Sequence, residues 1–377
     1  MGISGTIGVN LCWLVPGVVG GSEEYTLRLL RAVDRLGDDN LWIRLYGQRE
    51  LFEAHPDLAS RFECRSAPGP AAVKGARIGL EHTWLAAATR GDDIVHHAGG
   101  VVPAVRSTPT IVTVHDLQPL EMPQYFSKTK QRWLATMLPR SVRAARLVLC
   151  PSEFTAERLR LLLRVPNDKL RVVRHGHEAI EPGVLDADAH DRLTRRFGPF
   201  VLLPAISYPH KRHADLVVAL DRLRDRCPEL SVVMTGRPGP ETANLRQLAA
   251  RLRLQDRVHD LGRVSEEELD ALYRSAVALV FPSEYEGFGN PILEAMARGT
   301  PVITTDAAAL PEVVGAAGIT VPTGHPVALA DAIARVTEEP DLRRQLSAAG
   351  IERATQFSWL DAGRDLVDCY RQALRPT

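Results

Sequence analysis

The stretch FPSEYEGFGNPILEAMARGTPVI at residues 281–303 decides the fold class of this chain. An apolar run ends at Phe281, and a loop of small and acidic residues follows it. Pro291 suits the first position of a helix, and we expect Asn290 to be its N-cap. Gly299 then ends the helix before another apolar run. The stretch therefore predicts strand, loop, helix and strand, which is the repeating unit of a parallel α/β sheet.

Short apolar runs alternate with amphipathic helical patterns on both sides of this stretch. Strands are predicted at residues 7–14, 41–45, 94–97, 110–114, 147–150, 170–173, 200–203, 230–235, 258–261, 277–281, 301–303 and 318–321. Helices are predicted at 23–36, 76–88, 128–143, 152–163, 213–226, 242–252, 266–275, 291–297 and 326–337, and 342–374 is mostly helical. The pattern predicts the α/β class, with two doubly wound parallel sheets in succession.

The polar stretch at residues 175–198 interrupts the alternation and is predicted to link two domains. We place the first domain at residues 1–185, with a C-terminal helix at 358–377 packing back on it, and the second at 186–357. The length of 377 residues suits two domains of ~100–200 residues each. The formal net charge of zero argues against a nucleic acid as partner.

The apolar residues 7–21 follow no Lys or Arg and contain no A-x-A-like cleavage site. We therefore expect a first strand and a glycine turn there, not a signal peptide. The five cysteines are widely spaced and form no C-x-x-C, which predicts reduced thiols and no zinc site. These features favour a cytoplasmic protein.

The loop at residues 286–289 presents backbone N–H groups at the start of a helix, where anions bind readily. Gly287 and Gly289 allow a ligand to approach the backbone closely. The carboxylates of Glu286 and Glu294 flank this loop, and carboxylates accept hydrogen bonds from sugar and ribose hydroxyls. The same pattern also fits a capped helix with two solvated acids.

Three further segments place polar groups at the ends of predicted strands. Lys211 precedes an amphipathic helix, where its charge suits a diphosphate, although a solvated surface lysine fits equally well. Gly20 and Gly21 form a strand-to-helix turn. His115 and Asp116 leave a buried parallel strand at the edge where ligands bind in such sheets, and a strand-end cap is the alternative.

The EGFGNPILE segment resembles the Glu-x7-Glu motif of glycosyltransferase family 4, the retaining enzymes of GT-B fold, with Glu286 and Glu294 at the motif positions. The resemblance implies two Rossmann-like domains with an inter-domain cleft. It implies that Glu294 holds the ribose of a nucleotide-sugar donor. The transferred sugar and its phosphate would be held by Glu286 and the backbone amides of Gly287, Phe288 and Gly289.

The PHK segment resembles the family's diphosphate-binding lysine at Lys211. Ala205 and Ile206 stand where the family has an arginine, so the second cation is either missing or supplied by Arg212. The resemblance also implies that the loop containing Gly20 and Gly21, with Ser22 as the cap of the next helix, faces the donor diphosphate.

The HD pair resembles the family's residues beside the reacting sugar. The resemblance gives His115 a role at the reacting centre and lets Asp116 orient either His115 or the acceptor.

No metal or other cofactor is expected, because helix N-termini, loop amides and Lys211 neutralise the leaving diphosphate. The D-x-D pattern at residues 186–188 follows no strand, so we do not interpret it as a metal site. His96 and His97 end a strand and are expected to be buried or capping residues. The segments HDLQP and PQYFSK resemble bacterial mannosyl- and rhamnosyltransferases, which favours GDP-mannose.

The acceptor is expected to be a glycan, a lipid-linked sugar or a small molecule. Two alternatives remain: a nucleotide-sugar 2-epimerase of GT-B fold, which needs no acceptor, and a non-catalytic bilobed sugar-binding protein. The sequence leaves the oligomeric state open.

A basic segment lies in the first half of the chain. Residues 127–174 contain twelve Lys and Arg against three acids. Trp133, Leu134, Met137 and Leu138 are interleaved with some of these cations. The segment fits either an ordinary amphipathic helix or peripheral contact with anionic lipids at the inner face of a membrane.

Overall fold

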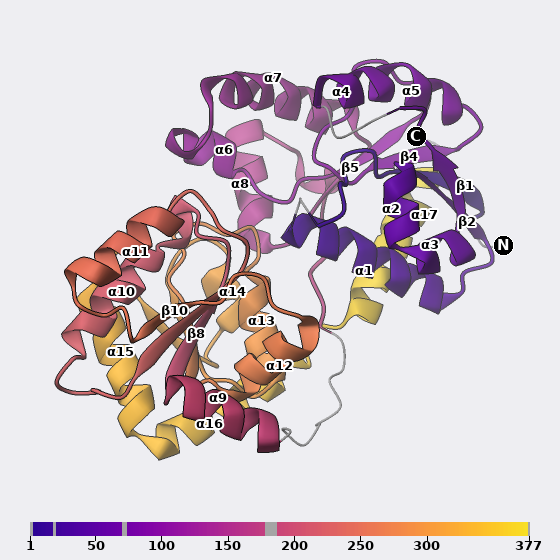
Figure 1. The fold of residues 1–377 in the computed structure, drawn as a ribbon. Helices are drawn as coiled ribbons and strands as arrows, with labels where there is room; N and C mark the ends of the chain where they lie inside the picture. The colour runs from indigo at the N-terminus through magenta and orange to yellow at the C-terminus, as the bar shows by residue number, and fades with distance from the viewer. Residues whose placement is uncertain (1–2, 18–19, 70–73, 178–186, 376–377) are drawn as a thin grey trace. The chain divides into compact units, whose positions relative to one another are not determined.

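The computed structural model describes residues 3–17, 20–69, 74–177 and 187–375. The chain divides into two compact units (Figure 1). Unit 1 comprises Met1–Gly176 and Ser358–Thr377, and unit 2 comprises His177–Phe357. The boundary expected at 185/186 falls at the edge of a stretch outside the described residues, and the two units meet in sequence at Gly176 and His177.

Unit 1 contains a seven-stranded parallel sheet of order β3-β2-β1-β4-β5-β6-β7. Its strands are β1 (Gly5–Asn10), β2 (Leu41–Gly47), β3 (Glu63–Ser66), β4 (Ile94–His97), β5 (Thr110–Thr113), β6 (Leu147–Cys150) and β7 (Leu170–Val172). Its helices are α1 (Gly21–Leu36), α2 (Arg49–Ala54), α3 (Pro56–Arg61), α4 (Lys74–His82), α5 (Trp84–Ala88), α6 (Gln118–Glu121), α7 (Lys128–Ala144), α8 (Glu153–Leu163) and α17 (Trp359–Leu374), with 3₁₀ turns η1 (Pro123–Tyr125) and η2 (Asn167–Lys169). The strand order reverses between β1 and β4, which makes that edge the expected ligand-binding position of the unit.

Unit 2 contains a six-stranded parallel sheet of order β10-β9-β8-β11-β12-β13. Its strands are β8 (Phe200–Pro204), β9 (Ser231–Thr235), β10 (Val258–Asp260), β11 (Ala278–Phe281), β12 (Val302–Thr305) and β13 (Ile319–Val321). Its helices are α9 (Ala187–Phe197), α10 (His213–Arg222), α11 (Thr242–Arg251), α12 (Glu266–Ser275), α13 (Asn290–Ala297), α14 (Leu310–Val314), α15 (Pro326–Glu338) and α16 (Pro340–Ala354), with a 3₁₀ turn η3 (Pro209–Lys211). The strand order reverses between β8 and β11.

Burial on both faces explains why the strands are continuous apolar runs. All four residues of β11 are buried, as are all four of β6. Helices cover both faces of a parallel sheet, so its strands need no polar alternation. In unit 2, right-handed crossovers place α10 and α11 on one face and α12 and α13 on the other, because the strand order reverses (Figure 1).

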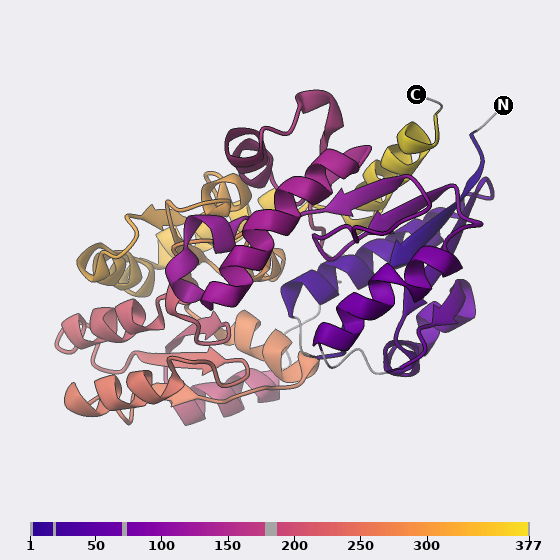
Figure 2. The ribbon, with the colours of Figure 1, turned by 90° about the horizontal axis from the view of Figure 1, so that it is seen from above.

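The last helix, α17, belongs to unit 1 and packs on α1. Trp359 and Tyr370 of α17 are buried in the same apolar cluster as residues of α1. Leu374, at the end of α17, lies against Gly5 at the start of β1, so the last helix and the first strand lie side by side in unit 1 (Figure 2). In the described part of the chain, no helix is both long and apolar enough to cross a bilayer.

The structure differs from the predicted elements where local signals are weak. The helix expected at 76–88 is two helices, α4 and α5, separated at Thr83. Strand β3 was not predicted, because its residues are only partly buried or exposed and lack an apolar run. The short helices α2 and α3 were also missed, since six residues carry little helical periodicity.

Candidate active site

Two loops of unit 2 lie at the point where its strand order reverses. Strands β8 and β11 pair directly, with Val201 opposite Ala278 and Leu202 opposite Leu279. The loop after β8 carries Lys211, and the loop after β11 carries Glu286. Because parallel strands end at the same edge of the sheet, this pairing brings two distant sequence segments together.

Lys211 and Glu286 form an ion pair at this edge. The ammonium Nζ of Lys211 lies 2.5 Å from Oε1 of Glu286, and the two side chains are only 18% and 13% exposed. Nζ also lies 5.0 Å from the centre of the Phe281 ring, close enough for a cation–π interaction. A backbone hydrogen bond from Glu284 N to His210 O, 2.9 Å long, joins the two loops. The sequence-predicted cation and carboxylate therefore share one site.

Arg212 follows Lys211 in the left-handed conformation, with φ of 52°. Its guanidinium donates to Asp215 through Nε (2.6 Å) and Nη2 (3.1 Å). Nη1 lies 3.4 Å from Oε2 of Glu284. Two carboxylates thus neutralise Arg212 here, so contact with a diphosphate would require it to exchange partners.

The glycine loop before α13 forms the start of that helix, but the cap differs from the prediction. Gly289, with φ of 106°, is the N-cap, and Asn290 is the first helical residue. The left-handed conformation favours glycine at the N-cap position, which explains why Gly289 is the cap and Asn290, the expected cap, is the next residue. Phe288 is buried in the core and packs edge-on against Phe357 with ring centres 5.9 Å apart. Any ligand contact of Phe288 must therefore come from its backbone.

Glu294 is held by two side chains. The Tyr273 hydroxyl donates to Oε2 at 2.7 Å, and Asn290 Nδ2 donates to Oε1 at 2.6 Å. Sequence reasoning did not assign these two positioning residues. The i, i+4 spacing of Asn290 and Glu294 could have predicted their contact, because such residues are neighbours on a helix. The sequence does not distinguish Tyr273 from an ordinary apolar residue of α12.

In unit 1, Gly20 and Gly21 open α1. Gly20 is the N-cap with φ of 86°, and no described atom lies within 4 Å of where a Cβ would stand at either glycine. Open space and a glycine conformation suit close approach by a ligand. Ser22 was expected to cap α1, but it lies inside the helix, and no side chain of the described residues makes the cap bond.

His115 lies just after β5, and a hydrogen bond defines the tautomer of its ring. Its Nε2 lies 2.8 Å from the carbonyl oxygen of Ala98, which can only accept, so Nε2 carries the proton and Nδ1 a lone pair. The rings of Trp13 and Tyr25 pack beside it, with centres 5.9 and 5.5 Å away. Burial lowers the pKa of His115 to about 4, so it is neutral at pH 7. The sequence did not indicate Trp13 or Tyr25 as its neighbours.

Asp116 lies next to His115, two residues before α6. Its Oδ1 accepts a hydrogen bond from the backbone N–H of Gln118 at 2.9 Å. This contact closes an Asx turn directly after His115 and stabilises the backbone there.

The histidines of β4, the cysteines and the D-x-D pattern were not predicted to bind a ligand. His96 bonds to Tyr370 and Thr113 at 2.9 and 2.7 Å, and His97 lies 3.2 Å from Asn10 Nδ2, which confirms that both are buried. All five cysteines are free thiols. Among the described residues, no cluster of His, Cys, Asp or Glu is suited to hold a metal ion. Asp186 of the D-x-D pattern lies outside the described residues.

Comparison with known proteins agrees with this geometry. A family profile described as "Glycosyltransferase Family 4" matches residues 19–179, and one described as "Glycosyl transferases group 1" matches 198–353. The chain is 31% identical over 317 residues to the MMP α-(1→4)-mannosyltransferase of Mycolicibacterium hassiacum, covering 78% of this chain and 74% of that protein. It is 29% identical to the O-antigen chain mannosyltransferase B of Escherichia coli over 286 residues, or 74% of each chain.

Solved structures show the same architecture. The sucrose-phosphate synthase of Thermosynechococcus elongatus superposes with a TM-score of 0.80 at 22% identity, covering 97% of this chain and 98% of that one. The Anabaena protein HepE, solved with UDP and glucose, superposes with a TM-score of 0.76 at 20% identity, covering 98% and 100%. These likenesses show the GT-B fold, and the sequence matches confirm the resemblance drawn from the motif. The chain therefore belongs to glycosyltransferase family 4 and is a glycosyltransferase of GT-B fold.

Proposed function

We propose that this enzyme transfers a hexose, with mannose from GDP-mannose favoured, from a nucleotide-sugar donor to a glycan, a lipid-linked sugar or a small molecule. The 2.5 Å pair of Lys211 and Glu286 beside the start of α13 carries the proposal. Its cation suits a diphosphate and its carboxylate suits sugar hydroxyls. The two mannosyltransferase relatives support the choice of mannose.

In this proposal, unit 2 holds the donor. Lys211 and the amides of Gly287, Phe288 and Gly289 neutralise the diphosphate, with Arg212 as a second cation once it exchanges partners. Glu294, held by Tyr273 and Asn290, accepts from the ribose hydroxyls.

Unit 1 contributes Gly20 and Gly21 to the diphosphate and His115 to the transferred sugar. A neutral His115 with a lone pair on Nδ1 is suited to accept a hydrogen bond from a sugar hydroxyl. Asp116 fixes the turn that carries His115. The acceptor attacks the face from which the phosphate leaves, and the leaving phosphate takes the acceptor proton, so the anomeric configuration is retained.

A panel of nucleotide sugars tests the donor. We expect GDP-mannose to raise the melting temperature and to be hydrolysed slowly without acceptor, with GDP and mannose as products. If only UDP-sugars stabilised the protein, the choice of GDP-mannose as the donor would be wrong. Release of nucleotide with an epimerised sugar would favour the 2-epimerase, and binding without turnover toward any acceptor would favour a sugar-binding protein.

Contact with anionic lipid is part of the proposal, but the apolar residues that would touch the lipid differ from those expected from the sequence. Leu134 and Leu138 of α7 are buried in the core of unit 1 and are not available to lipid. The exposed apolar side chains are Leu161 and Leu162 at the end of α8, 60% and 41% exposed. Helices α7 and α8 pack together, and Lys128, Lys130, Arg132 and Arg140 of α7 are exposed.

Flotation with vesicles containing phosphatidylglycerol tests this contact. We expect the protein to float at low salt, and Leu161→Ser/Leu162→Ser to reduce flotation while turnover of a water-soluble acceptor is kept. No flotation at low salt would exclude the membrane contact without affecting the donor assignment.

A further inference from the structure

The glycine loop before α13, at residues 286–289, is supported by α14. The backbone N–H of Ala309, the residue before α14, lies 3.4 Å from the carbonyl oxygen of Glu286. Leu310, the first residue of α14, is fully buried and packs on Gly289, where a Cβ would stand 2.7 Å from Cδ2 of Leu310. The position of α14 therefore determines where both ends of the loop lie.

Phe357 is the second support of this loop. Its ring packs edge-on against the ring of Phe288, with centres 5.9 Å apart, and the two side chains are only 4% and 3% exposed. The carbonyl oxygen of Phe357 accepts a hydrogen bond from the backbone N–H of His177 at 3.1 Å. Close packing leaves buried rings little freedom to move, so the Phe357 ring limits the positions open to the Phe288 backbone.

One guanidinium joins the two supports. Arg353 of α16 donates from Nε to the carbonyl oxygen of Val313 at 3.1 Å and from Nη2 to that of Glu312 at 2.6 Å. Both carbonyls belong to the last turn of α14, where the helix itself offers no partner. Cζ of Arg353 also lies 5.0 Å from the centre of the Phe357 ring, close enough for a cation–π interaction. Arg353 therefore holds α14 and Phe357 in place relative to each other.

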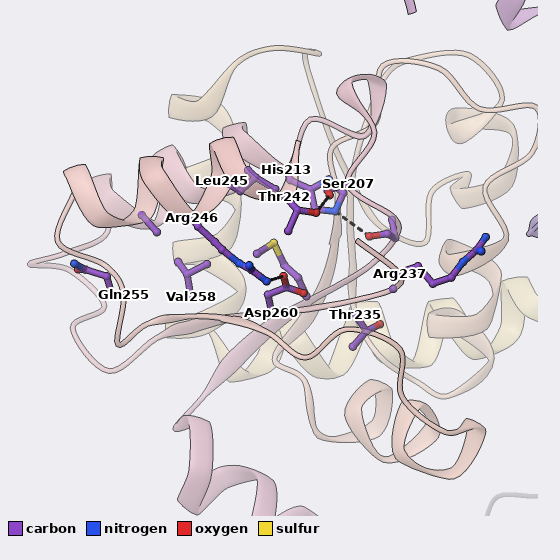
Figure 3. A pocket seen from close by; sticks show the side chains of 14 residues that line it. Ser207, His213, Thr235, Arg237, Thr242, Leu245, Arg246, Gln255, Val258 and Asp260 are labelled. Carbon is purple, nitrogen blue, oxygen red and sulfur yellow. Dashed lines mark hydrogen bonds and ion pairs between the residues drawn. The ribbon is translucent and has the colours of Figure 1, made fainter. Parts of the chain in front are cut away.

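These supports are separate from a pocket of unit 2. The pocket has a volume of about 170 Å³ and lies between α11 and strands β9 and β10. Thr235 and Arg237 line it at the carboxyl edge of the sheet (Figure 3). Arg353, Phe357 and Leu310 do not line it. A substitution of Arg353 therefore leaves the lining of the pocket unchanged, and a resulting change in nucleotide affinity can be attributed to the loop.

We propose that Arg353 is a positioning residue for the donor, because it holds α14 and Phe357 so that the backbone amides of residues 287–289 are fixed before the diphosphate arrives. The inference rests on the proposed function, in which these amides hold the diphosphate. Amides that are already fixed avoid the cost of ordering the loop on binding, and a site loses affinity when its supporting residues are loose.

The variant Arg353→Met tests the proposal, because it keeps an apolar stem and removes the guanidinium. Hydrogen–deuterium exchange measures the mobility of the loop, and calorimetric titration measures the affinity for GDP. We expect the amides of residues 287–289 to exchange about ten-fold faster and GDP to bind about ten-fold more weakly. Phe357→Leu should produce both effects to a smaller degree, and it decides the question if Arg353→Met does not fold.

Arg343→Met is the matched control. Arg343 lies on the same helix, α16, and its Nη1 donates to the carbonyl oxygens of Val336 and Thr337 in the last turns of α15, at 3.2 and 3.1 Å. The substitution removes the same kind of contact away from the loop, so loop exchange and GDP affinity should stay at their wild-type values. Melting curves establish that each variant is folded.

Unchanged exchange of the loop amides in folded Arg353→Met would overturn the proposal. Equal loosening of the loop in Arg343→Met would also overturn it, because the effect would then reflect a general loss of stability in unit 2. Faster exchange in Arg353→Met with an unchanged affinity for GDP would instead overturn the proposed function of the loop, since its amides would then not hold the diphosphate.

Discussion

Lys211 and Glu286 neutralise each other in the absence of a donor. A diphosphate must compete with the Glu286 carboxylate for the lysine, and the sugar must compete with the lysine for the carboxylate. A donor with both groups satisfies both residues, whereas a free nucleoside diphosphate leaves Glu286 without its cation. If the two residues hold the donor as proposed, we expect the pair to favour the intact nucleotide sugar over the spent nucleotide.

This competition predicts opposite effects from one substitution. In Glu286→Gln, GDP should bind about ten-fold more tightly, because no carboxylate competes for Lys211, while turnover should fall about 10²-fold or more. Calorimetric titration with GDP and an initial-rate assay measure the two effects. Glu338→Gln is the control, since its carboxylate pairs with Arg226, which has no assigned role at the donor. An unchanged GDP affinity in Glu286→Gln would contradict this account of the pair.

Tyr273 is predicted to act through Glu294. Tyr273→Phe keeps the buried ring but removes the hydroxyl 2.7 Å from Oε2, which should weaken donor binding about three- to ten-fold. Glu294→Ala removes the acceptor itself and should weaken binding more, about 10²-fold. The dissociation constant of the donor distinguishes these effects from turnover. Equal losses in the two variants would mean that Tyr273 does more than position the carboxylate.

At the scale of elements, the start of α13 depends on glycine at position 289. Gly289→Ala places a Cβ 2.7 Å from Cδ2 of Leu310 and requires φ of 106° from a residue with a side chain. We expect a loss of about 2 kcal/mol in the free energy of unfolding and weaker donor binding. Denaturant unfolding measures the loss. Gly79→Ala, in a helix with open space at the Cβ position, should be neutral or stabilising.

Strand β4 ends in two buried histidines, which predicts acid sensitivity of unit 1. Burial lowers the pKa of His96 and of His97 to about 3. In the unfolded chain both imidazoles become protonated below about pH 6.5, whereas in the folded chain they stay neutral down to about pH 3. The free energy of unfolding is therefore highest above pH 6.5 and falls as the pH decreases toward 3. At pH 5 each histidine should lower the free energy of unfolding by about 2 kcal/mol relative to neutral pH.

Calorimetric melting between pH 7.5 and 5 tests this effect. His97→Gln should reduce the loss of stability on acidification, because one titrating group is removed. His325→Gln, at an exposed position, should leave the dependence unchanged. A wild-type pH dependence in His97→Gln would show that this histidine does not drive it.

The strands around the site were predictable, and the caps were less so. Apolar runs identified β8 and β11 because both faces of a parallel strand are buried. The caps of α13 and α1 were misplaced by one or two residues, because Gly289 and Gly20 adopt positive φ and exclude the polar residues that usually cap. The partners of Glu294 and His115 depend on tertiary packing, which residue spacing does not encode.

At the scale of the whole molecule, charge neutralisation by the protein predicts that no divalent metal is needed. If Lys211 and the amides at the start of α13 face the diphosphate as proposed, EDTA should leave turnover within about two-fold of the untreated rate. Added Mg²⁺ or Mn²⁺ restoring activity after dialysis against EDTA would contradict this. Lys211→Met should lower turnover about 10²-fold or more under both conditions, since it removes the side-chain cation.

The two-domain architecture followed from the sequence because the α/β alternation stops near residue 175 and restarts at residue 200. The point where the chain passes between the units, at Gly176 and His177, was harder to locate. The polar stretch at residues 175–198 contains this point but does not single it out, because the constraint at Gly176 is spatial: a Cβ there would stand 2.1 Å from the backbone nitrogen of Trp359.

The placement of α17 on α1 has a practical consequence for dissecting this enzyme. Unit 2 is one uninterrupted segment of the gene and is suited to expression by itself, whereas truncation after Gly176 strips unit 1 of its last helix and uncovers apolar surface on α1. A stable N-terminal half should instead be obtained by splicing residues 358–377 directly behind Gly176, because these two segments already adjoin in the native fold.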